Sequence, residues 1–205
     1  MAAQRKITFT GAAGLLEGVL HLPNNAPNAI AMVAHPLPTM GGTMDNKVVT
    51  TLCRTFLELN YAVLRFNFRG VGESAGEYDE GNGETEDAIA AANLLQETYP
   101  ELPLTCAGFS FGGYVQARAA TELNPEKLVL IAPAVGRFEM PDVPENTLVV
   151  HGDLDEVVPL EDVLNWARPM QLPVIVLTGA EHYFHGRLTQ LKQIVLQHLK
   201  AQIGG

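Results

Sequence analysis

Short, continuous apolar runs alternate with longer amphipathic segments along most of this chain. Runs of this kind are typical of strands that are buried on both faces of a parallel sheet. The segments between them place apolar residues on one face at helical spacing, which predicts helices. The predicted strands cover about residues 29–34, 61–68, 102–107, 127–131, 147–151 and 173–177. The predicted helices cover about residues 46–59 (with Asp45 as N-cap), 84–99, 114–123 and 160–170, and a last helix carries Leu188, Leu191, Val195 and Leu199 on one face.

The start of the chain has a different pattern. Residues 6–10 and 15–22 alternate between apolar and polar and are joined by Gly11-Ala12-Ala13-Gly14, which predicts an antiparallel hairpin. Strands followed by helices predict an α/β fold: a mostly parallel central sheet with helices on both faces, here with an antiparallel N-terminal edge. There is no internal repeat, no linker and no loop long enough for a cap domain, so residues 1–205 are predicted to form a single domain.

Charge and cysteine content narrow the classes of partner. The chain has 13 basic and 23 acidic residues, a net charge of −10, which disfavours nucleic acid. No apolar run approaches the length needed to cross a bilayer, and the N-terminus lacks the apolar region of a signal peptide. Cys53 and Cys106 lie in predicted buried elements, as expected in a reducing compartment. We expect a cytoplasmic protein with a small-molecule substrate, no nucleic acid and no membrane partner; its oligomeric state is not predicted.

The strand at 102–107 and the helix at 114–123 are joined by Gly108-Phe109-Ser110-Phe111-Gly112. This is the G-x-S-x-G spacing of a nucleophile elbow, a sharp strand-to-helix turn that exposes the serine hydroxyl. Side chains two residues before and after the serine would collide in such a turn, so both positions need glycine. The start of the helix also directs free N–H groups toward the same point. Ser110 is therefore predicted to be a nucleophile.

A serine hydroxyl needs a base to take its proton, and the base needs an acid that fixes its tautomer. In sheets of this type, ligands bind at the carboxyl ends of the strands. Asp153 and Asp155 follow one predicted strand, and His182 and His185 follow the last one. A Gly-Ala pair before His182 lets the chain turn sharply over the sheet edge. This turn places His182 above the serine and His185 nearer the last helix, so His182 is the predicted base.

These motifs together resemble the α/β-hydrolase superfamily over nearly the whole chain. The resemblance is greatest to the small, cap-less bacterial serine hydrolases of the dienelactone-hydrolase-like and carboxylesterase type. It is carried by His35-Pro36-x-Pro38 with Gly41-Gly42, Arg69-Gly70-x-Gly72-x-Ser74, Gly108-x-Ser110-x-Gly112-Gly113, His151-Gly152-x-x-Asp155-x-x-Val158-Pro159 and Gly179-Ala180-x-His182. Dienelactone hydrolases proper use a cysteine nucleophile, so the serine in this elbow does not imply their activity.

The resemblance also implies which aspartate is the acid. The order Ser110, Asp155, His182 is the order of the triad in this superfamily, and the acid of its pattern precedes an x-Val-Val-Pro segment. Asp155 stands there and is the predicted acid. Asp153 is expected to hydrogen-bond the backbone of its own turn, as Asx residues do.

The oxyanion hole follows in part from the elbow. One donor is predicted to be the backbone N–H of Phe111, the residue after the nucleophile. The second should come from the loop after residues 29–34, where Pro36 and Pro38 have no N–H, so Leu37 is the predicted donor. Met40, Met44, Tyr183 and Phe184 are candidates for lining a substrate pocket, although each is equally acceptable as a core residue.

The remaining polar residues are assigned structural roles. His35 and Arg69 are predicted to organise their loops and His151 to pack at a strand end, whereas His21 and His198 are predicted to lie on the surface. The segment from His182 to His185 lacks the H-E-x-x-H spacing and a third ligand, so no metal site is predicted there.

The sequence therefore predicts a hydrolase of carboxylic esters or thioesters that acts through an acyl-Ser110 intermediate and needs no metal or organic cofactor. His182 is expected to move the proton, Asp155 to orient His182, and the Phe111 and Leu37 N–H groups to stabilise the oxyanion. Two alternatives remain open: a peptidase or amidase that uses the same triad, and a non-catalytic ligand-binding module on this fold.

Overall fold

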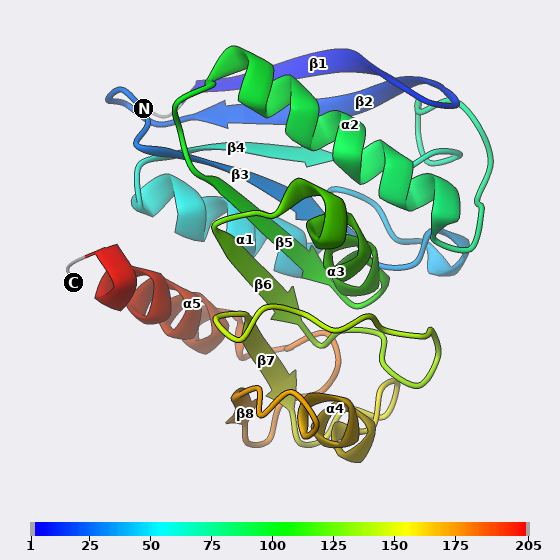
Figure 1. Cartoon of the computed structure of the whole chain (residues 1–205), viewed down its shortest axis with the longest axis vertical. Helices are drawn as coiled ribbons and strands as arrows, with labels where there is room; N and C mark the ends of the chain where they lie inside the picture. The colour runs from blue at the N-terminus through cyan, green and yellow to red at the C-terminus, as the bar shows by residue number, and fades with distance from the viewer. Residues whose placement is uncertain (1–2, 204–205) are drawn as a thin grey trace.

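The computed structural model describes residues 3–203, and within them all strands join one 8-stranded sheet (Figure 1). In chain order the strands are β1 (Ala3–Gly11), β2 (Gly14–Leu22), β3 (Ala29–Ala34), β4 (Tyr61–Phe66), β5 (Leu104–Phe109), β6 (Lys127–Ile131), β7 (Leu148–Gly152) and β8 (Val174–Leu177). Their order across the sheet is β1-β2-β4-β3-β5-β6-β7-β8. The pairs β1·β2 and β2·β4 are antiparallel and all other pairs are parallel, which confirms the predicted fold class.

The helices cover the sheet on both faces, as predicted. They are α1 (Lys47–Glu58), α2 (Asn82–Thr98), α3 (Phe111–Leu123), α4 (Leu160–Ala167) and α5 (Leu188–Ile203), with a short 3₁₀ turn at Pro38–Met40. Helices α2 and α3 lie side by side over one face (Figure 1). Helices α1 and α5 contact each other on the opposite face.

The side chains of a central strand such as β3 pack alternately into two separate hydrophobic cores. Ile30, Met32 and Ala34 of β3 pack into the core under α2 and α3. Ala31 and Val33, which point the other way, pack into the core under α1 and α5. Because successive side chains of a strand point to opposite faces, a strand covered on both faces must be apolar at every position. This requirement explains the continuous apolar runs in the sequence.

Several element boundaries differ from the prediction. Helix α3 begins at Phe111, directly after Ser110, three residues earlier than expected. Glycines at the next two positions lower helix propensity, and for that reason the sequence pattern concealed the first turn. Asp45 is not the N-cap of α1; Asn46 is, and its side chain accepts the Val48 N–H. Asp45 instead pairs with Arg65.

Of the two histidines predicted to lie on the surface, His21 is buried and His198 is partly exposed. His21 is buried on β2, where its Nε2 accepts a hydrogen bond of 3.0 Å from Arg65 Nε. Burial, together with the nearby charge of Arg65, lowers the pKa of His21 to about 4, so it is neutral at pH 7. His198 on α5 is half-buried. The long Arg65 side chain from the neighbouring strand covers His21, a contact that no local pattern reveals.

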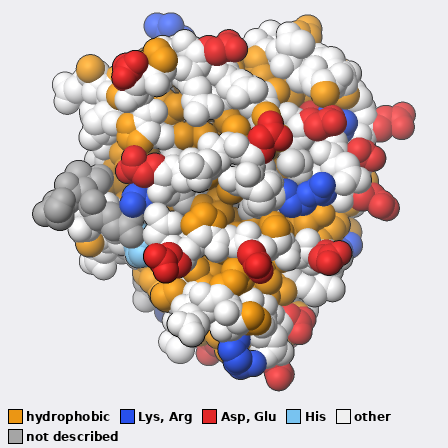
Figure 2. All heavy atoms as spheres, viewed as in Figure 1, with side chains coloured by type: hydrophobic (Ala, Val, Ile, Leu, Met, Phe, Trp, Pro, Cys, Tyr) orange, Lys and Arg blue, Asp and Glu red, His pale blue; other side chains and the backbone are white. Residues whose placement is uncertain are grey.

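Cys53 and Cys106 are both buried and neither forms a disulfide, as predicted. Within residues 3–203, none of the helices combines the length and the apolar character that crossing a membrane requires. On the face seen in Figure 2, acidic side chains are spread over the surface, and basic side chains stand at separate places among them. Among the described residues in that view there is no continuous basic surface.

Arg69 organises the long loop between β4 and α2. Its guanidinium forms hydrogen bonds of 2.9–3.2 Å with Asp87, and its backbone N–H donates to the same carboxylate at 2.8 Å. Glu86 also accepts from Arg69, at 3.0 Å. The side chain of Asp87 is completely buried, whereas that of Glu86 is 59% exposed. The loop that borders the carboxyl ends of the strands is thus tied to α2 through a buried ion pair.

Removal of Asp87 should therefore destabilise the protein far more than removal of Glu86. Asp87→Ala leaves the Arg69 guanidinium buried without its main counter-charge, and we expect the free energy of unfolding to fall by about 3–5 kcal/mol. Glu86→Ala removes an exposed partner of the same arginine and should cost less than about 1 kcal/mol. Urea unfolding of the two variants measures the difference, and equal losses would contradict the role assigned to burial.

Candidate active site

Ser110 lies between the carboxyl end of β5 and the first residue of α3. Its φ is 55° and its ψ is −119°, a conformation that residues with side chains rarely adopt and that costs of order 1–3 kcal/mol. Backbone hydrogen bonds hold it there. The Ser110 N–H donates to Ile131 O at 2.9 Å, and Ser110 O accepts from the Gly113 N–H at 2.9 Å and the Ala134 N–H at 3.3 Å. The elbow is thus anchored to the neighbouring strand β6 and the loop that follows it.

The two glycines of the elbow are required by close backbone approach. A Cβ atom on Gly108 would lie 2.2 Å from Gly112 O, and a Cβ atom on Gly112 would lie 2.5 Å from Ala34 O. Real Cβ atoms essentially never approach backbone this closely. The G-x-S-x-G spacing therefore reflects contacts within the turn and between the turn and β3.

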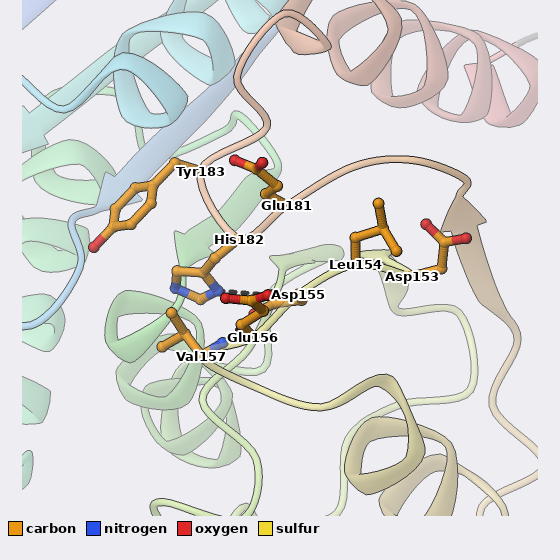
Figure 3. A pocket seen from close by; sticks show the side chains of 8 residues that line it. All are labelled: Asp153, Leu154, Asp155, Glu156, Val157, Glu181, His182 and Tyr183. Carbon is orange, nitrogen blue, oxygen red and sulfur yellow. Dashed lines mark hydrogen bonds and ion pairs between the residues drawn. The ribbon is translucent and has the colours of Figure 1, made fainter.

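His182 links Ser110 to Asp155. Its Nε2 is 2.9 Å from Ser110 Oγ, and its Nδ1 is 2.7 Å from Asp155 Oδ2. Because a carboxylate only accepts hydrogen bonds, Nδ1 carries the proton and Nε2 is free to accept the Ser110 hydroxyl. Figure 3 shows the His182 ring directed at the Asp155 carboxylate. The three residues come from the ends of β5, β7 and β8 and are buried together.

The carboxylate of Asp155 is fully engaged. Oδ1 accepts the N–H groups of Val157 and Val158 at 2.9 and 2.8 Å, and Oδ2 accepts from His182. Burial acts to raise the pKa of Asp155. The hydrogen bonds from His182 and Val158 outweigh this effect, so the pKa lies below its usual value. Asp155 is consequently ionised at neutral pH and holds His182 in one tautomer and orientation.

Asp153 and His185, the alternatives to Asp155 and His182, do not contact Ser110. Asp153 was predicted to hydrogen-bond the backbone of its own turn. Instead it accepts the N–H of Gly179, which ties this turn to the loop after β8. The close approach of the two loops explains this, because Leu154 N–H also donates to Ala180 O, at 3.1 Å. His185 is exposed, with Nδ1 3.7 Å from a Glu181 carboxylate oxygen, and its ring stacks on Tyr183.

Two buried histidines hydrogen-bond backbone groups of the loops that border the site. His35 Nδ1 is 2.7 Å from Pro36 O and its Nε2 accepts the Phe68 N–H at 3.1 Å, which joins the loop after β3 to the end of β4. Burial lowers the pKa of His35 to about 4. His151 Nε2 donates to Val158 O at 2.8 Å and lies 3.5 Å from Asp155 Oδ2. Both histidines fix loops, the role expected for His35. The position of His151 beside Asp155 was not expected from the sequence.

Ser110 and His182 border a small cavity of about 120 Å³. Its other lining residues are Pro36, Leu37, Met40, Gly41, Gly42, Asn46, Arg137, Val157 and Tyr183. Among residues 3–203, the structure gives no acceptor within the protein for the backbone N–H of Leu37 or for that of Phe111. Sequence reasoning missed Asn46, Arg137 and Val157 as lining residues because no motif marks them.

Of the four predicted pocket residues, two line the cavity and two do not. Met40 and Tyr183 line it, and they are 70% and 41% exposed. The backbone N–H of Met44 donates to Asn67 Oδ1 at 2.8 Å, which ties this residue to the segment after β4; its side chain is buried, and the residue borders a different pocket beside β2. Phe184 has a φ of 53°, and its side chain is fully buried in the core under α1 and α5. Phe111 is likewise a core residue.

A second, larger pocket of about 580 Å³ adjoins this cavity and shares Val157, His182 and Tyr183 with it (Figure 3). It is lined by Asp153, Leu154, Asp155, Glu156, Val157, Glu181, His182 and Tyr183. Acidic side chains dominate its polar lining. Among the residues that the structure describes, no group of three or more His, Cys, Asp or Glu side chains is arranged to hold a metal ion.

The sheet order, the absence of a cap and the strained serine elbow define an α/β hydrolase without a lid. Residues 26–146 match the model of the family described as serine aminopeptidase, S33. This match spans more than half of the chain, so the protein belongs to the S33 family of α/β hydrolases. The matched region contains Ser110 and ends before Asp155 and His182.

The chain is also similar to three other bacterial proteins, two of which are described as α/β serine hydrolases or their homologues. The chain is similar to XC6422 of Xanthomonas campestris, described as an α/β serine hydrolase without a lid, at 38% identity and a TM-score of 0.93 over 97% of this chain and 94% of that one. An α/β serine hydrolase homologue from Coxiella burnetii is also 38% identical, with a TM-score of 0.86 over 95% and 97% of the two chains. The uncharacterized protein RP471 of Rickettsia prowazekii (strain Madrid E) is 31% identical over 219 residues, 95% of this chain and 88% of the relative.

The close approach at the elbow leads to a test that uses two adjacent glycines. In Gly112→Ala the new methyl group must displace the backbone at the end of β3, and we expect the free energy of unfolding to fall by about 1–3 kcal/mol. Gly113→Ala meets nothing nearer than 3.3 Å, and the greater helix propensity of alanine offsets part of its cost. Chemical denaturation compares the two variants. A Gly113→Ala variant that is the less stable of the pair would contradict the geometry described.

Proposed function

We propose that this hydrolase cleaves carboxylic esters or thioesters through an acyl-Ser110 intermediate. The observation that carries the proposal is the continuous hydrogen-bonded chain from Ser110 Oγ through His182 to Asp155, with distances of 2.9 and 2.7 Å. Such a chain activates a serine that is otherwise a weak nucleophile. It lies at the carboxyl ends of parallel strands, where sheets of this type bind their ligands.

In the acylation step, Ser110 Oγ attacks the carbonyl carbon while His182 Nε2 takes the hydroxyl proton. Asp155 stays ionised and stabilises the positive charge that forms on the imidazole. The proton then passes from Nε2 to the leaving alcohol or thiol as the bond to the carbonyl carbon breaks. In deacylation, His182 takes a proton from water as the water oxygen attacks the acyl carbon. The proton then passes from His182 to Ser110 Oγ as the bond between Oγ and the acyl carbon breaks, and the carboxylic acid leaves. No metal or organic cofactor takes part in these steps.

The oxyanion of the tetrahedral intermediate needs hydrogen-bond donors that stand ready before the reaction. The N–H groups of Phe111 and Leu37 are proposed for this role. Phe111 is the first residue of α3, so its N–H points along the positive end of the helix dipole. Leu37 lines the same cavity as Ser110, and His35 fixes its loop. Removing one donor of this kind typically costs about 2.7–4 kcal/mol of transition-state stabilisation.

Variants of Ser110 and the two histidines test the mechanism. Ser110→Ala and His182→Ala should each lower kcat on a 4-nitrophenyl ester by about six orders of magnitude, and the double variant should lose little more, because the residues act as one unit. Ser110→Ala should also abolish labelling by a fluorophosphonate probe. Stopped-flow acylation kinetics measure the first step directly.

His185→Ala is the matched control, since it removes an exposed histidine three residues from the proposed base. It should retain most of the acylation rate. An active His182→Ala variant beside an inactive His185→Ala variant would refute the assignment. A folded wild-type protein that neither reacts with the probe nor turns over any ester would favour a non-catalytic ligand-binding module.

A peptidase or amidase is the second candidate, and the family description, serine aminopeptidase, is the observation that favours it. The same triad transfers acyl groups from amides, but it must then protonate a poorer leaving group. We expect kcat/KM on an acyl 4-nitrophenyl ester to exceed that on the matching 4-nitroanilide by about tenfold or more. Steady-state rates of the pair decide between them. Faster turnover of the anilides across several acyl groups, aminoacyl groups included, would establish an amidase instead.

A further inference from the structure

Arg137 lines the cavity that contains Ser110 and His182, although no motif in the sequence marks it. It belongs to the loop that leaves the carboxyl end of β6, next to the strand that carries the nucleophile. Apart from His182, it is the one residue in the lining of this cavity whose side chain can carry a positive charge. Because His182 accepts from the Ser110 hydroxyl in its resting tautomer, Arg137 supplies the positive charge of the cavity.

The loop that carries Arg137 is anchored on both sides of this residue. Val135 and Phe138 form an isolated β-bridge, and the Phe138 N–H donates to Ala134 O at 3.2 Å. The Phe138 ring stacks on Tyr114, with a centroid distance of 4.7 Å, and lies 5.2 Å from the ring of Phe111. Phe111 directly follows the nucleophile. The base of the Arg137 side chain is therefore held in a constant position relative to Ser110.

The guanidinium of Arg137 has no hydrogen bond or ion pair with another residue in the described part of the chain. By contrast, Arg65 and Arg69 both pair with carboxylates. The side chain of Arg137 is exposed, and none of the described carboxylates pairs with it although the net charge of the protein is −10. Its five donors remain available to a planar anion such as a carboxylate, which they bind in bidentate geometry.

The adjoining pocket of about 580 Å³ has the opposite charge. Asp153, Glu156 and Glu181 line it (Figure 3), so an anion placed there is repelled. A substrate that carries both an ester and a carboxylate is consequently oriented in one direction at Ser110. Its carboxylate lies on the Arg137 side, and its uncharged part lies toward Val157, Tyr183 and the larger pocket.

We propose that Arg137 is a specificity residue that binds a carboxylate of the substrate, and that the preferred substrates are monoesters of short dicarboxylic acids. The cavity volume of about 120 Å³ suits a short acyl group rather than a long chain. This inference rests on the proposed function, because it takes Ser110 as the residue at which the ester bond is cleaved. The binding of a carboxylate by Arg137 does not require that cleavage and can be tested separately.

The test compares two esters of the same acyl chain. Mono-4-nitrophenyl glutarate carries a free carboxylate, and 4-nitrophenyl methyl glutarate is its uncharged counterpart; spontaneous hydrolysis is subtracted in both cases. Arg137→Gln should lower the ratio of kcat/KM for the acid to kcat/KM for the neutral ester by about ten- to a hundredfold, as expected for a lost hydrogen bond between charged groups. Arg137→Lys should restore part of that ratio. In the wild type the ratio should fall as sodium chloride is added, because salt screens the attraction.

Arg168→Gln is the matched control. It removes the same charge from an exposed arginine at the C-cap of α4 that hydrogen-bonds Asn165 and lies outside the cavity. An equal drop in this variant would mean that net charge, and not Arg137, sets the preference. An unchanged ratio in Arg137→Gln, while Ser110-dependent turnover of the neutral ester continues, overturns the inference and leaves the proposed function intact.

A binding measurement tests the subsite without turnover. Monomethyl glutarate is titrated into Ser110→Ala protein and into the Ser110→Ala, Arg137→Gln double variant, and the dissociation constants are compared by calorimetry. The double variant should bind about tenfold more weakly or worse. Equal dissociation constants would overturn the inference. If wild-type protein cleaves neither ester while this difference persists, the proposed function fails and the anion site stands.

Discussion

The close packing of backbone against backbone around Ser110 is the constraint on which the rest of the site depends. The serine can keep its positive φ only because carbonyl and N–H groups of β6 and α3 satisfy its own backbone. The turn also lies so near the end of β3 that Gly112 has no room for a side chain. The elbow is therefore not a local turn that happens to carry a hydroxyl. It is the point at which three neighbouring strands and one helix meet.

The loops at the same edge of the sheet are held by polar groups that are almost completely paired, and most of these groups are buried. His35 joins the loop after β3 to β4, Asp155 accepts two N–H groups of its own turn, and Asp153 bonds the loop after β8. Arg69 ties a further loop to α2. A buried polar group that loses its partner costs about 1–3 kcal/mol, so these loops have few alternative conformations. Such preorganisation is what positions a serine, a histidine and an aspartate within hydrogen-bond distance before a substrate arrives.

Much of this architecture could be predicted because strands buried on both faces and amphipathic helices leave clear patterns. Strands β3 and β6 have the predicted limits. The errors arose where local preference and tertiary contact disagree. The glycines after Ser110 concealed the start of α3, and Arg65 covers a histidine that looked exposed. Met40 and Phe184 looked alike as pocket candidates, yet Met40 is exposed and Phe184 packs in the core under α1 and α5, a difference that arises from tertiary packing.

The sequence by itself determined the fold class, the elbow and the residues able to carry acyl-transfer chemistry, because each depends on a short-range pattern: the period of apolar positions, the spacing of glycines, the residue that follows a strand. The tertiary structure decided which of these residues meet. The sheet order brings the ends of β5, β7 and β8 to one edge, and there His182 bonds both Ser110 and Asp155. It also placed Arg137 in the cavity beside Ser110 and several carboxylates in the adjoining pocket. Contacts between loops far apart along the chain follow from the crossing order of the strands, and no local periodicity encodes that order.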